Sequence, residues 1–145
     1  MADKAALEAL IAENGHGILA TINADGSPQL SNVLYLWDAE RRLALMTTTA
    51  SRLKAKNLVR DPRCALHVGT DSFWAYAVAN GEAEVSAAAH APGDETCREL
   101  LPLYTALMGA PHDEDEFFAK MIVEGRLVVS FRYTRVHGVI VDKSA

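Results

Sequence analysis

The fold is decided by the stretch GILATINADGSPQLSNVLYLW, residues 17–37. Its first part, Gly17 to Ile22, is an apolar and β-branched run that predicts a buried strand, and Asn23 to Gly26 supplies turn residues. The second part, Gln29 to Trp37, alternates with a period of two and predicts the return strand of a hairpin. On this strand we expect one face to point into the core, formed by Leu30, Leu34 and Leu36, and the other face to carry Gln29, Ser31, Val33 and Tyr35.

More strands and a few helices are expected around this hairpin. Strands are predicted at 43–48, 64–69, 73–85 with a bulge or bend at Gly81, 126–133 and 136–141, and helices between 3 and 14 and at 51–59, 97–108 and 113–124. Ser51 is the expected cap of the second helix, and Pro102 is expected to kink or break the third. This β-rich meander with helical insertions predicts a mainly β (α+β) small barrel of six or so antiparallel strands with flanking helices, rather than a doubly wound sheet.

Length and composition bound the class of protein. The chain has 145 residues, 50% of them hydrophobic and 23% charged, which predicts a single globular domain over residues 1–145. The charged N-terminus lacks the apolar run of a signal peptide, and no later apolar stretch approaches the roughly 18 residues needed to span a bilayer. We therefore expect a cytoplasmic protein without a membrane partner. The net charge of −5 argues against a nucleic-acid partner.

Side chains that could act in covalent or metal catalysis form no recognisable pattern. Cys64 and Cys97 lack the spacing of a metal site or a redox pair, and the five histidines are scattered without a metal-binding motif. No serine lies in the G-x-S-x-G pattern of a serine hydrolase. We therefore expect no metal and assign no catalytic residue.

The basic stretch TTTASRLKAKNLVRDPR, residues 47–63, is the clearest functional signal. From Ser51 to Arg63, five cations accompany a single acid on an otherwise acidic chain. Hydroxyl groups and free N–H groups at a helix N-terminus suit a phosphate. Arg52 can grip such a group with two hydrogen bonds, and Lys54 can add a point charge. The alternative is that these cations form the solvated face of an amphipathic helix.

Residues 51–54 (SRLK), with Asn57-Leu58 and Asp61-Pro62, resemble the phosphate-binding segment of the pyridoxamine 5′-phosphate oxidase-like split-barrel flavoproteins. From about residue 5 to 140 the chain more closely resembles the branch of that family that uses the deazaflavin coenzyme F420. The residues that carry this likeness include 17–22, 25–26, 28–33, 74–78 and 81. The resemblance implies an FMN-binding type of split barrel that forms a homodimer, with the cofactor site at the subunit interface.

The resemblance also implies which residues bind the cofactor. Arg52 and Lys54 are expected to hold its phosphate or acidic tail, with Asn57 close by. The ring system is expected near Gln29, Ser31 and Asn32, and its edge or the ribityl chain near Thr47 and Thr48. Trp74 and Tyr76 are expected beside the cofactor, commonly from the other subunit, although they fit a core or a subunit contact equally well.

The implied function is that of an oxidoreductase, a reductase that passes a hydride from reduced coenzyme F420 to an unsaturated or conjugated small-molecule acceptor. The proton would come from solvent or from a donor such as Tyr35, Tyr76 or His67. Lys56 and Arg60 extend the cations toward a polyglutamate tail, which favours F420 over FMN. The alternatives are an FMN-binding oxidase or reductase of the same fold and a non-catalytic cofactor- or haem-binding split-barrel protein.

Overall fold

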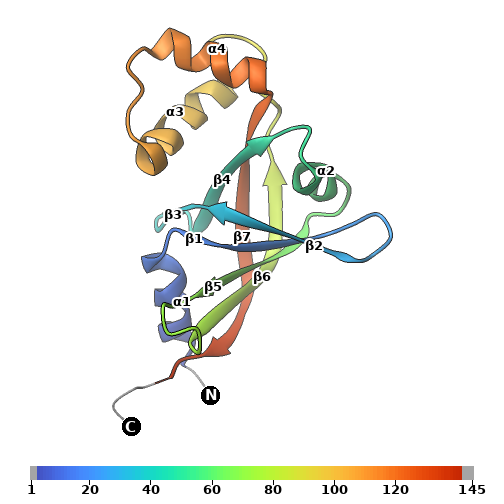
Figure 1. The fold of residues 1–145 in the computed structure, drawn as a ribbon, viewed down its shortest axis with the longest axis vertical. Coiled ribbons are helices and arrows are strands. Elements are labelled where there is room, and N and C mark those ends of the chain that lie inside the picture. The colour runs from blue at the N-terminus through green and yellow to red at the C-terminus, as the bar shows by residue number, and fades with distance from the viewer. Residues whose placement is uncertain (1–2, 142–145) are drawn as a thin grey trace.

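Seven antiparallel strands form one sheet in the computed structural model, which describes residues 3–141 (Figure 1). The strand order is β2-β1-β5-β6-β7-β4-β3. The sheet curls into a half-barrel with helices around it, which confirms the predicted split-barrel class. The elements are α1 (Lys4–Glu13), β1 (His16–Ile22), β2 (Pro28–Leu34), β3 (Leu36–Asp38), β4 (Leu43–Thr49), α2 (Leu53–Arg60), β5 (Arg63–Gly69), β6 (Tyr76–Val85), α3 (Glu95–Met108), α4 (Glu114–Glu124) and β7 (Arg126–Val139).

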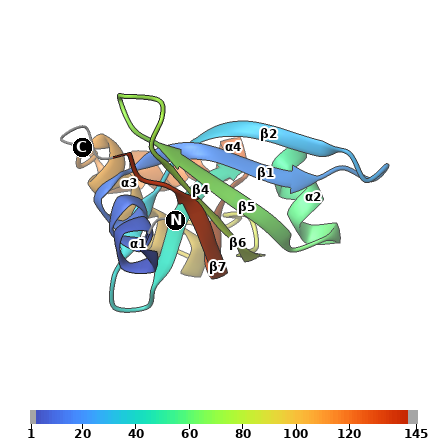
Figure 2. The same cartoon turned by 90° about the horizontal axis from the view of Figure 1, so that it is seen from below.

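The chain crosses from one edge of the sheet to the other at Tyr35. The single strand expected at 29–37 is in fact two strands, β2 at one edge and β3 at the opposite edge. Tyr35 is 1% exposed, its hydroxyl donates to the Ile11 carbonyl at 2.5 Å, and its N–H donates to the Gly15 carbonyl at 2.9 Å. This crossing brings the two edges of the curled sheet together. Figure 2 shows the curl from below, with α1 and α2 on opposite sides.

The two faces of β2 are the reverse of the prediction. Leu30 and Leu34 are 64% and 51% exposed, whereas Val33 and Tyr35 are buried in the barrel core. Leu36 is half-buried, against the helices rather than in the barrel. The predicted alternation is present, but the leucine face points outward, and the sequence cannot distinguish the two because an outward apolar row and an inward one have the same period.

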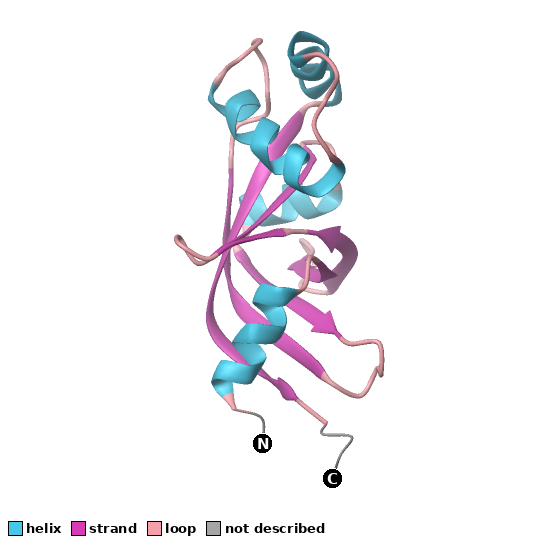
Figure 3. Ribbon diagram, turned by 90° about the vertical axis from the view of Figure 1, so that its left-hand side faces the viewer, coloured by secondary structure: helices cyan, strands magenta, loops and turns pink. Residues whose placement is uncertain are grey.

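Two apolar cores lie on the two sides of the sheet. The barrel core contains Leu19, Leu66 and Phe131, and α1 and α2 pack against it. The second core lies between α3, α4 and the outer side of β4 and β7, with Leu100 and Phe117 at its centre. Figures 1 and 3 show α3 and α4 at the end of the sheet away from the chain termini. Within residues 3–141, no helix is both long and apolar enough to cross a bilayer.

Two helices differ in detail from the prediction. The N-cap of α2 is Arg52 rather than Ser51, and no side chain caps the helix; the Ser51 hydroxyl instead lies 3.2 Å from that of Thr49. Helix α3 continues through Pro102, whose missing N–H removes one helical hydrogen bond, so of the two predicted effects of this proline the break does not occur.

The strands also differ in their limits. β6 begins at Tyr76 because Phe73, with φ of 70°, lies in a turn. β7 is one strand where two were expected, and its register against β6 shifts between Asn80 and Gly81, as a bulge at Gly81 predicts. A Cβ at Gly81 would lie 2.0 Å from the Arg132 carbonyl oxygen, so only glycine allows this close approach.

Candidate anion-binding site

Cationic groups from two segments of the chain, the start of α2 and the start of β7, lie close together. Arg52 precedes α2, Lys54 lies in its first turn, and Arg126 is the first residue of β7. The β4–β7 ladder pairs Thr49 with Arg126, and the N–H of Ala50 donates to the Gly125 carbonyl at 2.9 Å. The turn that leads into α2 therefore lies against the start of β7. We call Arg52, Lys54 and Arg126 the cation cluster.

The cation cluster lacks enough acid to neutralise it. Neither the Arg52 nor the Lys54 side chain forms a hydrogen bond or ion pair with any residue from 3 to 141, whereas Arg126 pairs with Glu124. Burial lowers the pKa of Lys54, and the positive charges of Arg52 and Arg126 lower it further. Positive charges held close together repel one another, and an anion bound among them offsets this repulsion. The cluster is therefore suited to an anionic ligand.

Surface hydroxyls beside the cluster come from residues other than the two predicted ones. Thr47 donates to the Leu127 carbonyl at 2.9 Å, and Thr48 is 4% exposed. Thr49 and Ser51, in contrast, place their hydroxyls at the surface just before Arg52. They add hydrogen-bond donors to the charge of the cluster.

A polar network joins β1, β2 and α2 on the inner side of the sheet. The Asn57 amide, 0% exposed, donates to Thr21 Oγ1 at 3.1 Å and to Asn23 Oδ1 at 2.9 Å. The Thr21 hydroxyl donates to Gln29 Oε1 at 2.9 Å, and Gln29 Nε2 donates to Ser31 Oγ at 2.8 Å. Asn57 thus anchors α2 to β1, with both of its amide hydrogens used, and the same network orients Gln29 and Ser31.

Two basic residues that follow Lys54 in the sequence bind other groups of the fold. Arg60 donates to Asn57 Oδ1 at 3.2 Å and to the Ile22 carbonyl. Arg63 pairs with Asp61 at 2.8 Å, and hydrogen bonds from Arg63 lower the Asp61 pKa to about 2. The five cations of the sequence segment therefore do not form one continuous track.

Three further predicted site residues lie elsewhere in the protomer. Asn32 is exposed on the face of β2 opposite to Gln29 and Ser31. Tyr76 stacks on His67 with ring centroids 5.4 Å apart, and Trp74, in the preceding loop, is 70% exposed. β5 leads from the α2 end of the sheet to this loop, and its six steps span about 20 Å. Within one protomer, Trp74 and Tyr76 are therefore remote from the cation cluster.

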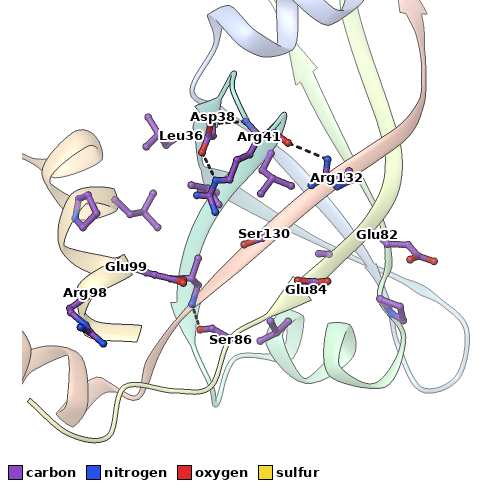
Figure 4. Close-up of a pocket in the computed structure, with 18 of the residues that line it drawn as sticks. Leu36, Asp38, Arg41, Glu82, Glu84, Ser86, Arg98, Glu99, Ser130 and Arg132 are labelled. Atoms are coloured by element: carbon purple, nitrogen blue, oxygen red, sulfur yellow. Dashed lines mark hydrogen bonds and ion pairs between the residues drawn. The ribbon is translucent and has the colours of Figure 1, made fainter. Parts of the chain in front are cut away.

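A groove of about 950 Å³ lies between α3 and the outer side of the sheet (Figure 4). Its apolar floor includes Leu45 and Val128, and carboxylates line it at Glu82, Glu84 and Glu99. A shallower hollow of about 490 Å³ lies over the β6 bulge. None of the ten predicted cofactor residues lines either cavity.

Sequence reasoning missed the groove and Arg126 for the same reason. The groove residues come from strands and a helix that are distant in the chain, and no local motif groups them. Arg126 lies far along the chain from Arg52 and Lys54, and only the β4–β7 register brings it beside them. The positive charge of the 51–63 segment can be seen in the sequence, whereas the position of Arg126 beside it cannot.

Comparisons with known proteins agree with this architecture. The family profile described as Pyridoxamine 5′-phosphate oxidase matches residues 3–139. A solved structure described as an F420 reductase is 26% identical, with a TM-score of 0.65, covering 90% of this chain and 94% of that one. A conserved hypothetical protein of Mycobacterium tuberculosis is 21% identical with a TM-score of 0.68, covering 100% and 96% of the two chains. The haem storage protein of Vibrio cholerae is 13% identical with a TM-score of 0.66, covering 95% of each.

Proposed function

Because this chain belongs to the pyridoxamine 5′-phosphate oxidase family, we propose that it is an oxidoreductase that binds a phosphate-bearing flavin or deazaflavin. The proposed cofactor is coenzyme F420, which in its reduced form supplies a hydride for an unsaturated or conjugated small-molecule acceptor. The observation that carries the proposal is the pair Arg52 and Lys54, two cations at the start of α2 without a counterion among residues 3–141. The F420 reductase that is 26% identical to this chain favours the deazaflavin over FMN.

The residues of this chain have distinct parts in the proposal. Arg52 and Lys54 bind the phosphate, and the surface hydroxyls of Thr49 and Ser51 add donors beside it. Ser31 Oγ accepts from Gln29, and its own hydrogen has no acceptor among residues 3–141, so it is free to donate to a bound ring. Hydride chemistry belongs to the cofactor, and the protein supplies position and electrostatics.

A second copy of the chain completes the proposed site. Leu30 and Leu34 are exposed on β2, and Ile18, 37% exposed, lies on the neighbouring strand opposite Asn32. An outward apolar row of this kind is typical of a subunit contact. In a homodimer built on this face, Trp74 and Tyr76 of one protomer become candidates for the cofactor site of its partner.

A cytoplasmic location is part of the proposal. Cys64 and Cys97 are both free and buried, as is usual in a reducing compartment. Burial raises the pKa of Cys64 to about 12, so its thiol stays protonated and unreactive.

Ligand titration tests the proposed cofactor. The purified full-length protein is titrated with oxidised coenzyme F420, FMN and haem, followed by fluorescence and visible absorbance. We expect F420 to bind most tightly. Tighter FMN binding would assign the protein to the flavin members of the fold, haem binding alone would make it a haem-binding protein, and binding of none would refute the proposal.

A double variant tests the proposed phosphate contacts. Arg52→Ala with Lys54→Ala is expected to weaken F420 binding at least thirtyfold, equivalent to about 2 kcal/mol, because two charge-assisted contacts are lost. The melting temperature of the empty protein should stay within about 2 °C, because neither side chain has a hydrogen-bond or ion-pair partner in the part of the chain that the structure describes. The matched control, Arg98→Ala with Lys120→Ala, removes two exposed cations from α3 and α4 and should bind like the wild type.

A further inference from the structure

Arg126 is held in place by two neighbours on the helical side of the site. Its Nε donates to Glu124 Oε2 at 2.9 Å, and its guanidinium carbon lies 5.9 Å from the centre of the Tyr104 ring. The side chain is 26% exposed, and that of Glu124 is 31% exposed. A carboxylate at one edge and an aromatic ring against one face restrict the orientation of the guanidinium group.

The other edge of this guanidinium remains available. Neither terminal nitrogen of Arg126 has a hydrogen-bond partner among residues 3–141. Arg126 is nevertheless close enough to Lys54 to lower the pKa of that ammonium group. Two nitrogens fixed side by side near a second cation form the fork that carboxylates and phosphates bind.

We propose that Arg126 is a third residue that binds the anionic part of the cofactor, and that Glu124 and Tyr104 are its positioning residues. The inference rests on the proposed function, because it concerns the same site. Arg52 and Lys54 approach the anion from α2, and Arg126 approaches it from β7. The anion is thus held between two elements that are far apart in the sequence.

Through Arg126, a bound anion would be connected to α3 and α4. Tyr104 belongs to α3, and its ring meets that of Phe117 in α4 edge-to-face, with centroids 5.3 Å apart. Glu124 is the last residue of α4, and Gly125 joins it directly to Arg126. An anion that fixes Arg126 therefore also restrains α3 and α4, and α3 borders the 950 Å³ groove. We infer that cofactor binding orders this side of the groove.

Variants of Arg126 test its role in binding. Arg126→Gln is expected to weaken binding of F420, and of inorganic pyrophosphate used as a simple anion, by about ten- to a hundredfold. Arg126→Lys keeps the charge but loses the fork, and should recover only part of the affinity. Lys120→Gln, which removes one exposed cation from α4, is the matched control and should bind as the wild type does. Wild-type affinity in Arg126→Gln would overturn the proposal.

Variants of Tyr104 test the positioning role. Tyr104→Phe keeps the ring beneath Arg126 and should bind F420 like the wild type. Tyr104→Leu removes the ring and should weaken binding about threefold, the effect of one cation–π contact. A merely structural tyrosine would instead lower the melting temperature without changing the affinity, and that result would refute the positioning role.

Hydrogen exchange tests the coupling to the helices. F420 should slow amide exchange in α3 and α4 of the wild type, and this protection should disappear in Arg126→Gln at ligand concentrations that still saturate it. Equal protection in both proteins would refute the coupling. If the wild type binds neither F420 nor pyrophosphate, the proposed function itself fails. If it binds both and Arg52→Ala with Lys54→Ala abolishes binding while Arg126→Gln does not, only this inference fails.

Discussion

Some polar residues of this protein stabilise the fold, and others are available to bind a ligand. Residues close together in the sequence can have these different roles. Lys54 has no hydrogen-bond or ion-pair partner among the described residues, whereas Asn57, one turn further along α2, has both amide hydrogens bonded inside the barrel. Both stand out in the sequence as polar residues of one basic motif. The structure separates them because Asn57 is fully buried against β1, whereas Lys54, half-buried in the first turn of α2, lies among the other cations of the cluster.

Substitution of Asn57 tests this division. Asn57→Ala leaves Thr21, Asn23 and Arg60 without their common partner and should lower the free energy of unfolding by about 2 kcal/mol. The control is Lys56→Ala, at an exposed neighbouring residue, which should change the free energy of unfolding by no more than about 0.5 kcal/mol. Urea unfolding followed by tryptophan fluorescence measures both. A stable Asn57→Ala protein with weakened cofactor binding would reassign the residue to the ligand.

At the scale of elements, most of the secondary structure could be predicted from the sequence, and the exceptions have physical causes. The Cys97 to Met108 stripe and the acidic start at Asp113 identified α3 and α4 correctly. The break at Tyr35 could not be predicted, because Leu34-Tyr35-Leu36 is as apolar as any strand interior and the crossing depends on contacts with α1. The turn at Phe73 was missed because a bulky residue at positive φ carries no sequence signal.

The cap of α3 gives this element a predictable pH dependence. Backbone N–H groups of His90, Ala91 and Cys97 donate to the Asp94 carboxylate and hold its pKa well below the ordinary range. The carboxylate therefore stabilises the fold above the unfolded pKa of about 3.9, and this contribution is lost as pH falls below that value towards the folded pKa.

The variant Asp94→Asn isolates that contribution. It should be less stable than the wild type by about 1 kcal/mol at pH 7, because one amide oxygen replaces two charged ones at the cap. The difference should shrink steadily as pH falls from about 5 to 2, as measured by denaturant unfolding at each pH. A gap that stays constant over this range would show that the charge of Asp94 contributes nothing to stability.

For the whole molecule, the outward leucines matter more than any single site residue. The family, the barrel class and the basic segment follow from sequence, whereas the orientation of Leu30 and Leu34 does not, since only the finished barrel distinguishes its inside from its outside. With Trp74 and Tyr76 remote from the cation cluster, one protomer holds only part of the predicted site. We therefore propose that a second copy of the chain completes the site.

Breaking the apolar row tests this conclusion. Leu30→Glu with Leu34→Glu should convert a dimer into a monomer in light scattering, because two charges would be buried at the contact. Cofactor binding should be lost together with the dimer. The control, Met108→Glu with Val123→Glu, places the same charges on apolar residues of α3 and α4 that are 70% and 86% exposed, and should remain dimeric. A wild type that is monomeric at all concentrations would refute the dimer.

The crossing at Tyr35 has one more consequence. The barrel has a seam, where β2 and β3 are joined by a covalent link instead of by a ladder of hydrogen bonds. Local opening is favoured where cross-strand hydrogen bonds are fewest, so we expect the barrel to open first along this line. The half-buried Ser31 lies on β2, which borders the seam, so we expect looser packing of Tyr35 to bring more water to the hydroxyl proposed to face the reactive ring.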